Sequence, residues 1–92
     1  MRIAVCDDES VFVSQIKENI EAYYNNWEAL IDTFFSGEEL LRATLTKKYD
    51  LIFLDIEMNG KDGLTVVREL HEIYPKLPII FLTSHTELAM EG

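Results

Sequence analysis

The stretch Leu51-Ile52-Phe53-Leu54-Asp55 decides the fold that this sequence predicts. Four consecutive apolar residues end at a carboxylate, and a segment rich in turn-forming residues follows from 56 to 63. A short apolar run bounded by turn residues is typical of a strand buried on both faces, as in a parallel sheet. Ligands of open α/β sheets bind outside the carboxyl ends of the strands. We therefore expect Asp55 to be held by a rigid strand and to face a functional site.

Three further runs predict strands. They span residues 3–6, 29–35 and 79–83. We expect 29–35 to be an edge strand with Asp32 pointing to solvent, and 79–83 to be buried. Between the runs, apolar residues recur at helical spacing. These stripes are Phe12, Ile16, Ile20 and Tyr23; Leu40, Leu41 and Leu45; and Leu64, Val67, Leu70 and Tyr74. Strands that alternate with helices in this way indicate a parallel sheet with right-handed crossovers.

Local signals predict where the helices begin and end. Asn25-Asn26 closes the first helix, and Pro75 terminates the third. Ser36-Gly37-Glu38-Glu39 has the form of a capping box that opens the second helix. Ser84-His85-Thr86-Glu87 has the same form and predicts the start of a fourth.

Length and composition limit the function. Ninety-two residues make one small domain, and 17 acidic against 8 basic residues give a formal charge of −9. This balance argues against binding of a nucleic-acid backbone by this segment. The single cysteine, Cys6, fits a reducing compartment, and His71 and His85 are expected to be surface residues. With neither a signal-peptide pattern nor a membrane-spanning stretch, a cytoplasmic location is expected.

Polar residues follow three of the predicted strands. Asp7 and Asp8 follow the first, Asp55 ends the third, and Thr83 and Ser84 end the fourth. If these strands are neighbours, their carboxyl ends converge in one cleft. Close carboxylates repel one another unless a cation lies among them, and carboxylates with backbone carbonyls suit Mg²⁺. The residues therefore indicate a Mg²⁺-assisted phosphoryl site with a carboxylate nucleophile.

Together these motifs resemble the receiver domain of two-component response regulators. The resemblance rests on four segments in order and spacing: Cys6-Asp7-Asp8-Glu9, residues 49–55, Met58 to Gly63, and residues 79–84. It implies a flavodoxin-like, doubly wound parallel sheet of four strands in the order 2-1-3-4, with three to four helices. Ile56-Glu57-Met58 and Glu87-Leu88-Ala89 resemble receivers that precede a LytTR-type DNA-binding domain.

The resemblance also implies roles for individual residues. Asp55 is the implied phosphoacceptor, Thr83 binds a phosphoryl oxygen, Ser84 lies beside it, and Gly63 lets the loop turn into the third helix. The donor is a phosphohistidine on a sensor histidine kinase, and the signal passes to an output module, with transcription regulation as the outcome. Such a domain is a phosphoacceptor and not a turnover enzyme. The implied Mg²⁺ ligands are Asp7, Asp8, Asp55 and the backbone carbonyl of Glu57.

The sequence departs from the family pattern in two places. Asn59 stands where the family often has proline. The family also has a fifth strand with a following lysine, a switch aromatic and a fifth helix, and the 92 residues stop before them. We therefore expect residues 1–92 to be the N-terminal part of a receiver domain in a longer regulator. An uncovered fourth strand makes self-association a further expectation.

Two other functions fit part of the pattern. Asp55-Ile56-Glu57 resembles the strand-terminal acidic pair of Mg²⁺-dependent phosphatases of the haloacid dehalogenase type, although that family has aspartate at the second position. A third reading is an interaction module that is not phosphorylated. Cys6 is interpreted as a small buried hydrophobe, because no histidine or cation is evident beside it.

Overall fold

The computed structural model describes residues 1–24, 29–57 and 63–82. Within them, four parallel strands form one sheet in the order β2-β1-β3-β4. The predicted fold class and strand order are therefore confirmed. The elements are β1 (Arg2–Cys6), α1 (Ser10–Tyr23), β2 (Leu30–Phe34), α2 (Gly37–Thr44), β3 (Leu51–Asp55), α3 (Gly63–Ile73) and β4 (Ile79–Leu82).

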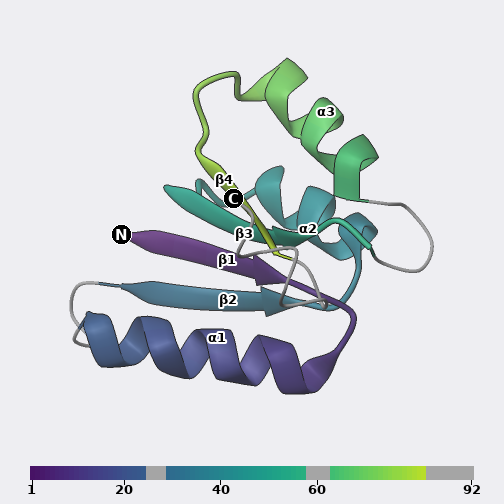
Figure 1. The fold of residues 1–92 in the computed structure, drawn as a ribbon. Coiled ribbons are helices and arrows are strands. Elements are labelled where there is room, and N and C mark those ends of the chain that lie inside the picture. Colours follow the sequence, from purple (N-terminus) through teal and green to yellow (C-terminus); the bar gives the residue numbers. More distant parts are fainter. Residues whose placement is uncertain (25–28, 58–62, 83–92) are drawn as a thin grey trace.

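Helices cover both faces of the sheet, as Figure 1 shows: α1 lies on one face, and α2 and α3 lie on the other. Successive residues of β1 point to opposite faces because side chains alternate along a strand. Ile3 and Val5 pack with α1, whereas Ala4 and Cys6 join the cluster under α2 and α3. The sheet is thus the middle of three layers, and its central strands β1 and β3 contribute half of the buried apolar residues.

The predicted helix stripes are partly wrong. In α1, Val13 and Ile20 are the buried residues, while Tyr23 is 83% exposed. In α3, Val66 and Leu70 are buried, whereas Leu64 is 59% exposed. Several apolar spacings satisfy a period of 3.6 residues, and only the angle at which each helix packs on the sheet selects one of them. In α2, Leu40 is buried as expected, but Leu45 lies beyond the helix end and is exposed.

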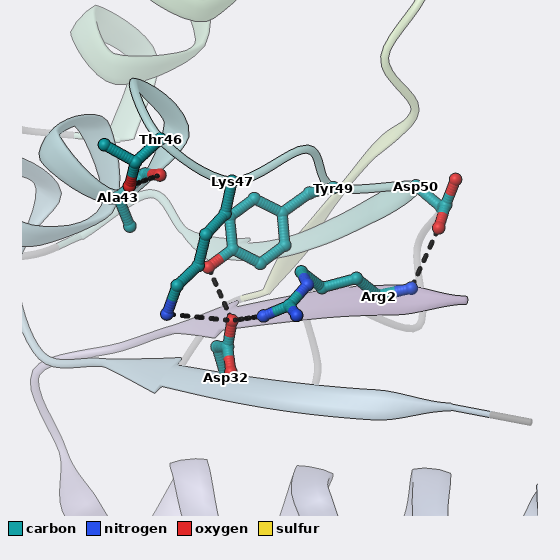
Figure 2. A network of polar contacts seen from close by, with 7 residues as sticks. All are labelled: Arg2, Asp32, Ala43, Thr46, Lys47, Tyr49 and Asp50. Atoms are coloured by element: carbon teal, nitrogen blue, oxygen red, sulfur yellow. Dashed lines mark hydrogen bonds and ion pairs between the residues drawn. The ribbon is translucent and has the colours of Figure 1, made fainter. Parts of the chain in front are cut away.

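The edge position predicted for β2 is confirmed. The prediction that Asp32 points to solvent is wrong. Figure 2 shows three groups converging on one of its carboxylate oxygens, Oδ2. The Tyr49 hydroxyl donates to it at 2.7 Å, Arg2 Nη1 at 2.9 Å, and Lys47 Nζ lies 3.9 Å away. Partial burial by itself would raise the pKa of Asp32, but these donors outweigh it and hold the pKa below its usual range.

β4 is the other edge of the described sheet, as the predicted strand order implies, but it is less buried than its apolar sequence predicts. In the described residues β4 has one neighbouring strand, β3, and its Ile80 and Phe81 are each 46% exposed. The apolar run was expected to be buried, but a strand at the edge of a sheet is covered less than a central one. No helix in the described ranges has the length and apolar character needed to cross a membrane.

The helix signals are confirmed where the structure describes them. Ser36 Oγ accepts a hydrogen bond from the amide of Glu39 at 3.2 Å, and this is the predicted cap of α2. The Glu39 side chain accepts a hydrogen bond from the amide of Phe35 at 3.5 Å. In an ideal capping box the donor would be the amide of Ser36, one residue later in the chain. α3 ends at Ile73, two residues before Pro75. Asn25-Asn26 and the Ser84–Glu87 signal lie outside the described residues.

Candidate functional site: a carboxylate cluster

Two central strands bring the acidic residues together. β3 ends at Asp55, and Asp7 follows the last residue of β1. The two strands pair in parallel with Cys6 opposite Leu54, so the next residues, Asp7 and Asp55, emerge side by side at the carboxyl edge. The apolar sequences of β1 and β3 therefore position both carboxylates, because those side chains fix the strands in the core.

The cluster consists of Asp7, Asp8 and Asp55. One carboxylate oxygen from each residue lies within 4.8 Å of the others. Asp7 and Asp55 are each 1% exposed, and Asp8 is half-buried. The predicted convergence is thus confirmed for the carboxylates that follow or end two of the three strands, β1 and β3. Thr83 and Ser84 lie outside the described residues.

Backbone amides orient the two buried carboxylates. The amide of Glu9 donates to Asp7 Oδ1 at 3.0 Å, and the amide of Glu57 donates to Asp55 Oδ1 at 3.0 Å. In both cases the donor is two residues further along the chain, which is the geometry of an Asx turn. Sequence reasoning missed these donors, although an aspartate at the start of a loop is the usual signal for such a turn. Each turn holds a carboxylate in one orientation toward the cluster.

The electrostatics of the cluster favour a cation. Burial raises the pKa of Asp7, the Glu9 amide opposes this, and the nearby carboxylates Asp55 and Asp8 raise it further, to about 6. A raised carboxyl pKa means that the fully ionised cluster holds negative charge that the protein itself does not balance. A divalent cation with a preference for oxygen ligands would supply that balance. Three carboxylates at this spacing fit Mg²⁺ by donor type and charge.

A glycine brings α3 close to the site. A Cβ atom on Gly63 would lie 2.5 Å from the carbonyl oxygen of Asp55 and 2.5 Å from Cα of Ile56. The Gly63 amide also donates to the carbonyl of Ile56 at 3.4 Å. Gly63 is therefore needed for the close approach of the α3 start to the backbone that follows β3.

The predictions for Cys6 and Glu57, which lie close in sequence to the cluster residues, have different outcomes. Cys6 is a buried free thiol whose Sγ donates to the carbonyl of Ser36 at 3.4 Å. Burial, followed by the negative charges of the surrounding carboxylates, raises its pKa to about 12, so it stays an unreactive thiol and its interpretation as a buried hydrophobe is confirmed. Glu57 is exposed, and the ligand role of its backbone carbonyl stays a prediction.

Comparisons with known proteins identify relatives along the whole chain. The model of the response regulator receiver domain matches residues 3–91. The transcriptional regulatory protein RprY of Bacteroides fragilis is 35% identical over 94 residues, covering 100% of this chain and 38% of that protein. The DNA-binding transcriptional regulator NtrC of Klebsiella pneumoniae is 43% identical over 56 residues, covering 61% of this chain and 12% of that protein. The chain thus spans well under half the length of these relatives.

Solved structures of response regulators are also similar to this chain. The response regulator TrrA of Thermotoga maritima, in complex with Mg²⁺-BeF, matches with a TM-score of 0.82 and 37% identity, covering 94% of this chain and 71% of that one. TrrA in complex with the histidine kinase ThkA matches with a TM-score of 0.80 and 38% identity, covering 90% and 68%. These comparisons support the predicted resemblance and lend no support to the phosphatase alternative. The LytTR subclass stays a prediction.

Proposed function

Because this chain belongs to the response regulator receiver domain family, we propose that Asp55 accepts a phosphoryl group and that Asp7 and Asp8 help to hold the Mg²⁺ that assists the transfer. Receiver domains are phosphoacceptor signalling domains and not turnover enzymes. The observation that carries the proposal is the position of Asp55, buried at the end of a central strand and within 4.8 Å of Asp7 and Asp8. The backbone carbonyl of Glu57 is the proposed fourth ligand.

The proposed transfer needs little chemistry from the protein beyond position and charge. A carboxylate oxygen of Asp55 attacks phosphorus while the bond from phosphorus to the donor nitrogen breaks, and the leaving imidazole takes a proton from water. Bound Mg²⁺ would neutralise negative charge on the carboxylates and on the phosphoryl oxygens. The Glu57 amide fixes the Asp55 side chain for this attack. The product is an acyl phosphate at the carboxyl edge of the sheet.

Thr83 and Ser84 are the proposed contacts to the phosphoryl oxygens. Support comes from their place in the chain: β4 ends at Leu82, and Leu82 is the residue paired with Asp55. A hydroxyl that follows this position can donate to a phosphoryl oxygen. By the resemblance, a phosphoryl group at Asp55 would draw Thr83 toward it and so change the surface near the end of β4.

The partners are proposed from the relatives. TrrA has been solved with the histidine kinase ThkA, and we propose a sensor histidine kinase as the phosphoryl donor here. RprY and NtrC are transcriptional regulators, which supports an output in transcription and a cytoplasmic location. The 92 residues then form the N-terminal part of a receiver domain in a longer regulator, in agreement with the 71% of TrrA that they cover.

The test is the intact mass of the chain after incubation with Mg²⁺ and acetyl phosphate. We expect one phosphoryl group per chain, released by hydroxylamine as an acyl phosphate would be, and no labelling of Asp55→Asn. Asp50→Asn is the matched control, because it is the same substitution at the opposite end of β3. Equal labelling of Asp55→Asn and wild type would refute the assignment of the phosphoacceptor.

A further inference from the structure

A second candidate site lies at the opposite edge of the sheet. A cavity of about 440 Å³ is lined by Thr44 and by the segments 47–50 and 74–78, which lead into β3 and β4. Because the strands are parallel, this is their amino edge, whereas the carboxylate cluster is at the carboxyl edge. The five residues of β3 separate the two by about 15 Å. The volume is within the usual range of small-molecule pockets.

Hydrogen bonds brace the walls of this cavity. The Tyr74 hydroxyl donates to the carbonyl of Thr44 at 2.7 Å and so ties the end of α3 to the end of α2. The Leu77 amide donates to the Tyr74 carbonyl at 3.1 Å, and the Ile52 amide donates to the Pro78 carbonyl at 3.1 Å. Both prolines of the chain, Pro75 and Pro78, lie in the lining and restrict its backbone. Hydrogen bonds within the protein thus hold the walls of the cavity in place.

The chemistry of the lining is apolar with a cationic rim. Lys47, Lys48 and Lys76 are exposed and supply three of the eight basic residues in a chain of charge −9. Lys47 lies near Asp32, but within the described residues neither Lys48 nor Lys76 forms an ion pair. The one carboxylate in the lining, that of Asp50, accepts the backbone amide of Arg2 at 2.8 Å (Figure 2).

We propose that this cavity binds a small amphiphilic anion, an aromatic or short aliphatic carboxylate or sulfonate. Its apolar part would lie against Tyr74, Pro75 and Pro78, and its charge would be met by Lys48 and Lys76. An apolar body suits the lining because it removes exposed carbon surface from water. An anion suits the rim because Lys48 and Lys76, which form no ion pair with the part of the chain that the structure describes, gain an opposite charge there. This site is independent of phosphoryl transfer at Asp55.

The test uses two dyes with the same aromatic body and different charge. Fluorescence titration of the 92-residue chain with 8-anilinonaphthalene-1-sulfonate measures binding of the anion, and N-phenyl-1-naphthylamine is the neutral counterpart. We expect the double variant Lys48→Gln/Lys76→Gln to bind the sulfonate roughly three- to tenfold more weakly, and the neutral dye unchanged. Lys17→Gln, on α1 and away from this cavity, is the matched control and should behave as wild type.

Amide chemical-shift mapping locates the dye. Shifts caused by the sulfonate should gather at Lys48, Asp50, Lys76 and Leu77. A second hollow beside α1, lined by residues that include Ile16 and Phe53, offers the dye another apolar surface. Shifts confined to that hollow, or a double variant that binds the sulfonate as tightly as wild type, would overturn the proposal.

Discussion

The hydroxyl of Tyr49 donates to Asp32 Oδ2 at 2.7 Å and joins the segment before β3 to the edge strand β2. Arg2, at the start of β1, donates to the same oxygen at 2.9 Å (Figure 2). Three elements that are distant in sequence therefore meet at one carboxylate. Because this oxygen accepts from a buried hydroxyl and a guanidinium, it should contribute measurably to stability.

Asp32→Asn should lower the free energy of unfolding at pH 7 by about 1 kcal/mol, because it weakens both hydrogen bonds and the ion pair with Arg2. The pKa of Asp32 is lowered in the folded state, so its stabilisation is present above the unfolded pKa. That stabilisation is lost as the pH falls through the folded pKa. Urea denaturation should thus show that the free energies of unfolding of wild type and Asp32→Asn become more similar as the pH falls. A difference that stays the same at low pH would contradict this assignment.

Tyr49→Phe removes only the hydroxyl group and so measures what its hydrogen bond to Asp32 contributes to stability. The ring is buried and packs edge-on against Phe34 with centroids 6.2 Å apart, and phenylalanine keeps that contact. We expect a loss of about 1 kcal/mol in the free energy of unfolding, measured by urea denaturation at pH 7. Tyr23→Phe is the matched control, since Tyr23 is 83% exposed and should be nearly neutral. Equal effects of the two substitutions would show that the Asp32 bond contributes nothing.

Asp7→Asn should stabilise the metal-free protein at pH 7, by about 1–3 kcal/mol, because it removes a buried charge beside two other carboxylates. The folded pKa of Asp7 is raised to about 6 from 3.8, so the stability that it contributes is complete below the unfolded pKa. This stability is lost as the pH rises through about 6. Wild-type protein without metal should therefore melt higher at pH 5 than at pH 7, and Asp7→Asn should lose this part of the difference.

If the cluster binds Mg²⁺, the ion should offset the stability advantage that Asp7→Asn has over wild type without metal. Millimolar Mg²⁺ should raise the melting temperature of wild type at pH 7, because the ion binds the folded state, and should raise that of Asp7→Asn much less. Glu21→Gln, an exposed position on α1, serves as the control for a general effect of charge. An equal Mg²⁺ response in all three proteins would argue against a metal site at Asp7.

Gly63→Ala should destabilise the fold and disturb the site together. The added Cβ would meet two backbone atoms, the Asp55 carbonyl oxygen and Ile56 Cα, each at 2.5 Å, and backbone cannot yield as a flexible side chain can. We expect a loss of about 2 kcal/mol or more by urea denaturation, with weaker Mg²⁺ binding. Alanine favours a helix more than glycine does, so an unchanged or raised stability would show that α3 has room to move away.

Local sequence patterns were sufficient to predict the four strands and the carboxylates that follow them, whereas the strand order was predicted from the resemblance to receiver domains. An apolar run such as 51–55 followed by turn residues is a local pattern, and parallel pairing then brings Asp7 and Asp55 to one edge. The Ser36 cap could also be predicted from a local pattern, because the donor of its hydrogen bond is only three residues away.

Only the tertiary structure decided which residues those elements contact. The partners of Asp32 are 17 and 30 residues away, and the buried face of α1 includes Val13 instead of Tyr23. The cavity between the ends of α2 and α3 likewise joins two segments that no local pattern connects. Backbone periodicity determines which side chains share a face of an element. The register and angle at which elements pack determine what that face meets, and these depend on the whole fold.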